Sequence, residues 1–181
     1  MVNIGYYICM QEELTKEQIS LILKGEYKAD FIEAFGIIHY HYEDCAEKDL
    51  VQTQKDGVRV HYKCKKAFDK MHEAALKEGI ELEIISAYRS SKYQIEIFKY
   101  KFKDKENPTL EELKKRLSVS APSGYSEHHT GLAIDINSVE DDFADTKEAL
   151  WLEKNAPKFG FELSFPKNNK QGLAYEPWHW R

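Results

Sequence analysis

The chain has 181 residues, of which 42% are hydrophobic and 31% charged, and this fits one globular domain large enough to bury its own core. Its formal net charge of −5 argues against a nucleic-acid or anionic-membrane partner, because either would need a clustered basic surface. No stretch approaches the roughly 18 apolar residues of a membrane span. The three cysteines have no CxxC spacing, so neither a disulfide framework nor a cysteine-ligated zinc is indicated.

The N-terminal segment 1–18 does not have the features of a signal peptide. It lacks a basic start and a long apolar run followed by small residues. As written, the chain is therefore expected to remain in the cytoplasm. It would act in the periplasm or cell wall if a leader had been removed.

Capping pairs, in which a short polar residue is followed three residues later by Glu or Gln, predict four helix starts. They are Thr15 with Gln18, Ser91 with Gln94, Thr109 with Glu112, and Asp145 with Glu148. Gly25 and Pro157 are expected to end the first and last of these helices. A further helix is predicted over about 61–78, because Cys64, Phe68, Met71 and Ala75 repeat at helical spacing before Gly79.

Short β-branched or alternating segments predict strands over 80–86, 132–137 and 161–165. Residues 120–131 and 166–172 are rich in turn-forming residues, and 173–181 is expected to be extended. Segment 36–45 is a candidate for an added hairpin strand. Helices followed by short strands indicate an α+β fold in which a small antiparallel sheet is flanked by helices.

Asp135 is the first candidate for a functional residue. It lies on the polar side of an otherwise apolar strand, and a carboxylate near a core needs a cation, a helix N-terminus or a metal as partner. The alternative is an aspartate bonded to neighbouring backbone groups. His128 lies seven residues earlier, which would place it on the opposite face of a continuous strand, but a bend at Gly131 would bring the two together.

His179 completes a candidate zinc site with these two residues. A catalytic zinc has three protein ligands of the histidine and carboxylate type and one open position for water. Glu176 precedes His179 by three residues, and Pro177 between them interrupts regular strand pairing. Glu176 would then be a general base for a metal-bound water without being a ligand itself.

Three segments resemble those of a known enzyme family. SEHHTGLAID, residues 126–135, and EPWH, residues 176–179, are similar to the SxHxxGxAxD and ExxH motifs of the VanY-type D-alanyl-D-alanine carboxypeptidases, zinc peptidases that trim bacterial cell-wall peptides. SAYRSSKYQ, residues 86–94, resembles the family's SGYRS segment, which has a glutamine five residues after the arginine. Ala87 stands where the family has glycine. The resemblance covers about residues 60–181.

The resemblance implies a role for each matching residue. His128, Asp135 and His179 would bind one Zn²⁺ ion, and Glu176 would be the catalytic base. Arg89 would bind substrate and stabilise charge, as a catalytic and a substrate-binding residue, while Gln94 and Ser126 would line the pocket. His129 and Glu127 flank the first ligand, and we expect each to lie behind the ligands or on the surface.

The expected function is a zinc-dependent carboxypeptidase that removes the C-terminal D-alanine from peptidoglycan stem peptides. The alternatives are an L,D-carboxypeptidase, an endopeptidase cutting between L-alanine and D-glutamate, and a zinc-stabilised module that binds wall peptides without cutting them. The expected partner is a stem peptide or its precursor, with no nucleic acid and no membrane span, and the chain is expected to be a monomer. We predict a single domain, with a peptidase core over about 60–181 and an extension over about 1–59 packed on it.

Overall fold

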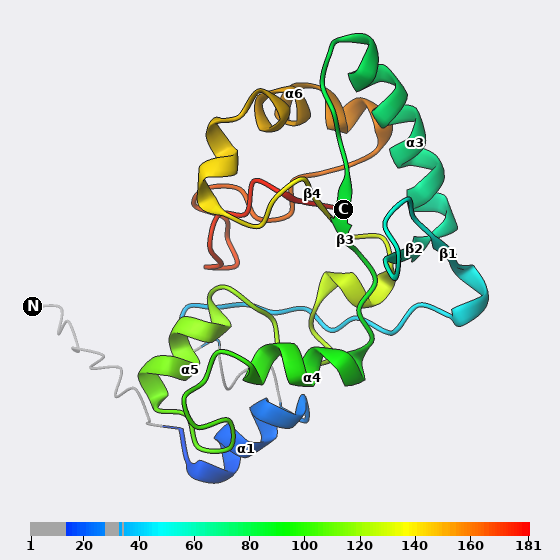
Figure 1. The fold of residues 1–181 in the computed structure, drawn as a ribbon. Helices are drawn as coiled ribbons and strands as arrows, with labels where there is room; N and C mark the ends of the chain where they lie inside the picture. The colour runs from blue at the N-terminus through cyan, green and yellow to red at the C-terminus, as the bar shows by residue number, and fades with distance from the viewer. Residues whose placement is uncertain (1–13, 28–32, 34) are drawn as a thin grey trace, which may run out of the picture.

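Helices surround a small three-stranded antiparallel sheet in the computed structural model, which describes residues 14–27, 33 and 35–181 (Figure 1). The sheet has the order β3 (Ile84–Ser86), β4 (Ile134–Ile136) and β5 (His179–Trp180). A separate antiparallel pair joins β1 (Leu50–Gln52) to β2 (Arg59–His61). The α+β prediction with a small antiparallel sheet is therefore confirmed. The N-terminal segment 1–18, in which no signal peptide is expected, lies largely outside the described residues.

The first apolar cluster packs α3 (Tyr62–Lys77) and α6 (Lys147–Asn155) beside the sheet. The buried residues of α3 are the four that its periodicity predicted, and His61 caps the helix by accepting the amide of Lys63. Ile134, Ile136 and Trp180 bring β4 and β5 into the same cluster. The metal-binding candidates on these strands therefore sit on a frame held by apolar burial, the main favourable term in folding.

The second apolar cluster lies at the other end of the molecule and gathers α1 (Lys16–Lys24), α4 (Ser91–Lys99) and α5 (Leu110–Leu117) (Figure 1). Its buried apolar residues are Ile22, Leu23, Tyr27, Ile37, Phe98, Phe102, Leu113 and Leu117. The predicted capping boxes at Thr15 and Thr109 both form, and Gly25 ends α1 in the left-handed conformation. The two clusters lie on either side of the site described below.

Two of the predicted capping pairs are wrong by one residue. The N-cap of α4 is Ser90, whose hydroxyl accepts the Tyr93 amide, whereas Ser91 donates its amide and hydroxyl to Asp44. The N-cap of α6 is Thr146 and not Asp145. In both places an adjacent hydroxyl residue takes the cap, and the capping pattern alone does not distinguish the two neighbours.

The predicted strands are also shorter than expected or absent, and 132–137 forms a strand only over Ile134–Ile136, in β4. The segment 80–86 forms a strand only at its end, in β3, and 161–165 contributes a single bridge between Leu163 and Trp180. Residues 36–45, the candidate hairpin strand, form no strand and no hairpin. Instead, this segment is fixed by main-chain hydrogen bonds from Ile38 to Gln171, from Tyr42 to Gly124 and from Cys45 to His129. These partners are all loop residues or 3₁₀-helical residues. The segment therefore has no neighbouring strand with which to form a regular ladder.

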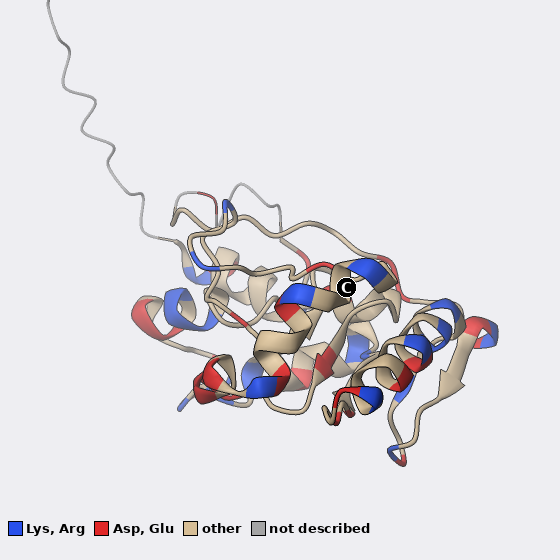
Figure 2. Ribbon diagram, turned by 90° about the horizontal axis from the view of Figure 1, so that it is seen from above, with Lys and Arg blue, Asp and Glu red and all other residues tan. Residues whose placement is uncertain are grey.

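Charged side chains are spread along the helices. Figure 2 shows that basic and acidic residues are interspersed along the helices. This agrees with the prediction that the lysine-rich segments belong to helices. Within the described ranges, no helix has the length and apolar character needed to cross a membrane.

Candidate metal centre and substrate cleft

The structure brings His128, Asp135 and His179 together at the centre of the molecule. One potential ligand atom from each lies within 4.8 Å of the other two, and all three side chains are buried. The Asp135 carboxylate joins the histidines, with Oδ2 3.4 Å from His128 Nε2 and Oδ1 3.1 Å from His179 Nδ1. Asp135 therefore has side-chain partners, and the alternative of a purely backbone-bonded aspartate is wrong.

A bend at Gly131 places His128 beside Asp135, as the sequence predicted. His128 lies in the short 3₁₀ helix η2 (Glu127–Thr130), and Gly131 follows it with a φ of 67°. The glycine leads the chain into β4, where Asp135 pairs directly with His179 of β5. A side chain at position 131 would meet the His61 backbone nitrogen at 3.1 Å, so β2 closes the space behind the bend.

The spacing of the three side chains is compatible with a zinc site. Zinc–ligand bonds of about 2.0–2.2 Å place neighbouring ligand atoms roughly 3.3–3.6 Å apart. Asp135 approaches this spacing with a different oxygen toward each histidine, and one ligand atom from each of the three residues lies within 4.8 Å of the others. His128 donates from Nδ1 to the Ala87 carbonyl at 2.7 Å, which leaves the Nε2 lone pair facing the cluster. Two imidazoles and one carboxylate are also the donor types of catalytic zinc sites. The described residues thus include a suitable set of protein ligands.

Two carboxylates flank His179 and differ in pKa. Burial raises the pKa of Glu176 to about 7, and its Oε2 lies 3.9 Å from His179 Nδ1. Burial also opposes ionisation of Glu127, but hydrogen bonds from His179 and Ser164 and the Arg181 guanidinium lower its pKa to about 2. Carboxylates with such different pKa values suit different tasks, Glu176 for proton transfer near neutral pH and Glu127 as a permanent anion.

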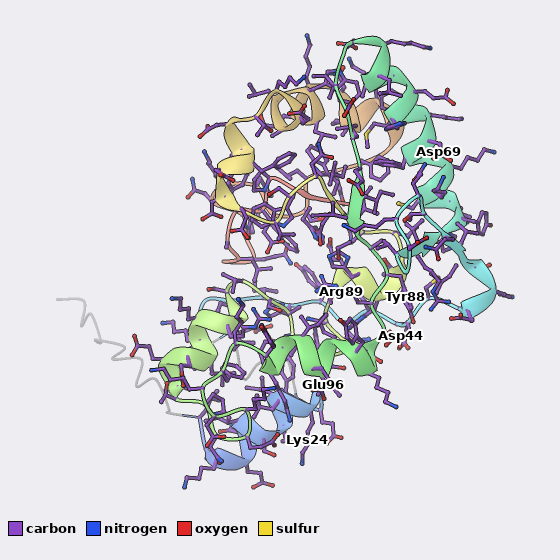
Figure 3. The ribbon with its side chains drawn as sticks, viewed as in Figure 1. Lys24, Asp44, Asp69, Tyr88, Arg89 and Glu96 are labelled. Atoms are coloured by element: carbon purple, nitrogen blue, oxygen red, sulfur yellow. The ribbon has the colours of Figure 1, made fainter. Side chains whose placement is uncertain are left out.

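Arg89 lies in the loop between β3 and α4, and Figure 3 shows it between α4 and the sheet. It lines a cleft of about 490 Å³ together with Gln94, Ser126, Glu176 and the metal-binding candidates. The side chain is partly buried, which lowers the pKa of the guanidinium, while Asp135 and Glu176 act in the opposite direction. Its Nε has no hydrogen-bond acceptor among the described groups. Arg89 is thus a positive charge available in the cleft beside the candidate metal site.

Gln94 and His129 form hydrogen bonds to main-chain groups of the loops that line the cleft. Gln94 donates from Nε2 to the Ala121 carbonyl at 2.7 Å, and this fixes the loop that precedes η2. His129 is fully buried, with Nδ1 2.6 Å from the Arg89 carbonyl and Nε2 accepting the Gly124 amide at 3.0 Å. His129 therefore ties the arginine loop to the metal-ligand loop, so the expectation of a residue behind the ligands describes it better than a surface position.

The remaining described histidines have other partners. His39 and His72 bond to the carbonyls of Leu117 and Leu82, and His61 caps α3. His41 lies 3.8 Å from Glu43 on the surface. The HYHY segment therefore contributes no second pair of histidine ligands in the described part of the chain.

Comparison with known proteins supports the motif-based resemblance. Residues 57–181 match the VanY family of D-alanyl-D-alanine carboxypeptidases. The chain belongs to this family. A candidate carboxypeptidase of Bacillus subtilis, YodJ, is 36% identical over 154 residues, which are 79% of this chain and 54% of that protein. The chain spans about half the length, or less, of the curated relatives it matches.

Solved structures of relatives share the fold. The vancomycin-resistance D,D-pentapeptidase VanY, in a variant bound to Zn(II), is 28% identical with a TM-score of 0.64, covering 81% of this chain and 86% of its own. The L,D-carboxypeptidase LdcB is 33% identical with a TM-score of 0.64, covering 77% of this chain and 69% of its own. VanYB in complex with D-alanine-D-alanine is 29% identical with a TM-score of 0.61 and covers 77% of both chains.

Sequence reasoning missed the environment of Glu127. The residues around its carboxylate are Tyr42, Ser164, His179 and Arg181, which come from three distant parts of the chain. Only the position of Glu127 next to a predicted ligand gave a signal. Residues that assemble through tertiary contacts leave no local motif.

Proposed function

We propose that the chain is a zinc-dependent carboxypeptidase that removes the C-terminal D-alanine from peptidoglycan stem peptides. The observation that carries this proposal is the juxtaposition, in one cleft, of a buried His–Asp–His set with Glu176 and Arg89. The Zn(II)-bound VanY and the D-alanine-D-alanine complex of VanYB, both similar in fold, support the metal and the substrate class.

In this proposal His128, Asp135 and His179 hold zinc, which when bound lowers the pKa of a coordinated water to about 7 and polarises a carbonyl. Glu176 accepts the proton of the attacking water and returns it to the departing amine. Its pKa of about 7, caused first by burial, lets it exchange a proton near neutral pH. The position of its carboxylate beside His179 but outside the ligand set fits this role.

In this proposal Arg89 has one of two tasks, and the first is to bind the free C-terminus of the peptide. A guanidinium binds both oxygens of a carboxylate at once, and burial strengthens the attraction between opposite charges. The same group can instead stabilise the negative oxygen that develops at the scissile carbonyl. The two tasks make different predictions for substrates with a blocked C-terminus.

L,D-carboxypeptidase activity is the second candidate, because LdcB is as similar in fold as the D,D-pentapeptidase VanY. Both activities release one D-alanine from a stem peptide. They differ in the configuration of the residue on the other side of the cleaved bond, which the cleft beyond the metal must distinguish. The same zinc chemistry serves either substrate.

The test is mass spectrometry of the purified, zinc-loaded chain with a mixture of stem tetrapeptide and pentapeptide. Loss of one alanine from the pentapeptide supports D,D activity, and loss from the tetrapeptide alone shifts the assignment to L,D. Chelator treatment and the Glu176→Gln variant serve as controls, and both should abolish release. No cleavage of either peptide would reject the carboxypeptidase proposal.

A further inference from the structure

We propose that Glu127 is a positioning residue for His179. Its carboxylate holds Nε2 of the imidazole, so that Nδ1 faces Asp135 and the metal position. This inference rests on the proposed metal site, and it assigns a task to a residue that the family motifs leave unassigned. It also gives segment 37–46, which precedes the family match, a part in building the site.

The His179 ring is held between two carboxylates. Nδ1 lies 3.1 Å from Asp135 Oδ1, and Nε2 lies 3.0 Å from Glu127 Oε2. A neutral imidazole that presents Nδ1 to a metal carries its proton on Nε2, and this N–H then needs an acceptor. Glu127 is 6% exposed, and its ionised carboxylate supplies that acceptor where water has little access. The pair therefore fixes both the rotation of the ring and the nitrogen that faces the metal.

The carboxylate of Glu127 is itself held by three groups besides His179. Ser164 donates its hydroxyl to Oε2 at 2.6 Å, and Tyr42 donates its hydroxyl to Oε1 at 3.2 Å. Arg181 Nη1 lies 3.2 Å from Oε1. With four partners Glu127 has little rotational freedom, so the position of its Oε2 defines the position of the ring.

Main-chain hydrogen bonds fix two of the residues that contact the Glu127 carboxylate, Tyr42 and Arg181. Tyr42 donates its amide to Gly124, and Arg181 exchanges two main-chain hydrogen bonds with Glu162, of 2.9 and 2.7 Å. The Arg181 guanidinium also pairs with the exposed Glu162 carboxylate. Arg181 thus contacts one buried and one exposed carboxylate, and only the buried one touches His179. This arrangement provides a matched control within the same protein.

The experiment measures the zinc affinity of metal-free wild-type, Glu127→Gln and Glu162→Gln proteins by competition with a chromophoric chelator. Each substitution removes one negative charge next to Arg181. Partners of metal ligands typically contribute about ten- to hundredfold in metal affinity, so we expect a loss in this range for Glu127→Gln and a change within about threefold for Glu162→Gln. Equal affinities of wild-type and Glu127→Gln protein, or equal losses in both variants, would overturn the inference.

A spectroscopic readout separates positioning from general destabilisation. In the zinc-loaded protein labelled with ¹⁵N-histidine, the Nε2 proton of His179 should lie far downfield because it bonds to a carboxylate. The Glu127→Gln variant should move this resonance upfield, and Ser164→Ala should move it less, because it only loosens the carboxylate. An unchanged resonance in Glu127→Gln would overturn the inference even if that variant were less stable.

Neither readout uses peptide cleavage, so the inference and the proposed activity are tested separately. A wild-type chain that binds zinc without cutting stem peptides would reject the activity, while the affinity ratios would still decide the role of Glu127. A wild-type chain that fails to bind zinc would overturn both.

Discussion

Replacing Gly131 by alanine tests whether the bend between the first two metal ligands depends on its backbone conformation and on the space behind it. The residue has a φ of 67°, which an alanine adopts at a cost of roughly 1–2 kcal/mol. A Cβ here would also meet the His61 nitrogen at 3.1 Å and the Cβ of His61 and Cδ2 of Leu50 at 3.2 Å. The first two neighbours belong to β2 and its link to α3, so they cannot yield as a flexible side chain would.

Gly57 is the matched control, because its φ is 77° and nothing lies within 4 Å of a Cβ built on it. Both substitutions place an alanine at a positive φ, which destabilises the folded state by a similar amount. Both also restrict the unfolded chain, which stabilises the protein by about 0.4–1 kcal/mol. Gly131→Ala adds overpacking of about 1–3 kcal/mol. At about 2–4 °C per kcal/mol for a chain of this size, its Tm should lie roughly 2–12 °C below that of Gly57→Ala.

The assay is thermal unfolding of the metal-free variants, followed by chelator competition for zinc. Gly131→Ala should also weaken zinc binding, because the displaced bend moves His128 relative to Asp135, while Gly57→Ala should bind zinc as the wild type does. The reasoning is refuted if the two variants have the same Tm and the same zinc affinity.

Three further predictions concern the metal and the substrate. Alanine at His128, Asp135 or His179 should lower the bound zinc, measured by elemental analysis, well below one ion per chain, and full stoichiometry in all three variants would reject the ligand set. Arg89→Ala should reduce kcat/KM far more for peptides with a free C-terminus than for amidated ones, whereas equal losses would assign the arginine to the oxyanion. Burial disfavours the charged imidazole, but hydrogen bonds with Asp135 and Glu127 raise the pKa of His179 to about 10 in the metal-free protein. Zinc binding at pH 7.5 should therefore release at least one proton, and it should tighten as the pH rises toward 10. Calorimetry in two buffers of different ionisation enthalpy would detect the release, and binding without proton release would contradict the protonated ring.

The helices could be read from the sequence because their signals are local. Periodic apolar residues specified α3, and capping boxes specified α1 and α5. An N-cap was predicted wrongly where either of two adjacent residues could cap the helix and a distant group binds one of them. Ser91, for example, bonds to Asp44, which lies 47 residues earlier, and this leaves Ser90 to cap α4.

The strands were harder to predict because their partners are few and remote. The segment 161–165 alternates as a strand would. Its main-chain contacts with the C-terminal segment are the Leu163–Trp180 bridge, the exchange between Glu162 and Arg181, and a bond from the Glu176 amide to the Phe165 carbonyl, and they do not form a regular ladder. Segment 37–46 has the composition of a strand but pairs with loops. A period of two describes which side chains would share a face and says nothing about whether a partner strand exists.

The difference between local signals and contacts among distant segments also explains which parts of the site could be predicted from the sequence. The metal-ligand candidates occupy η2, β4 and β5, which are adjacent in the fold, and two short motifs contain all of them. The shape of the cleft beyond them depends on contacts between segments that are far apart in the sequence. Such contacts include His129 to Arg89 and Tyr42 to Glu127. Substitutions at these positions should therefore change substrate preference and metal geometry without removing a ligand, and this part of the molecule is where members of one family with the same motifs can differ in specificity.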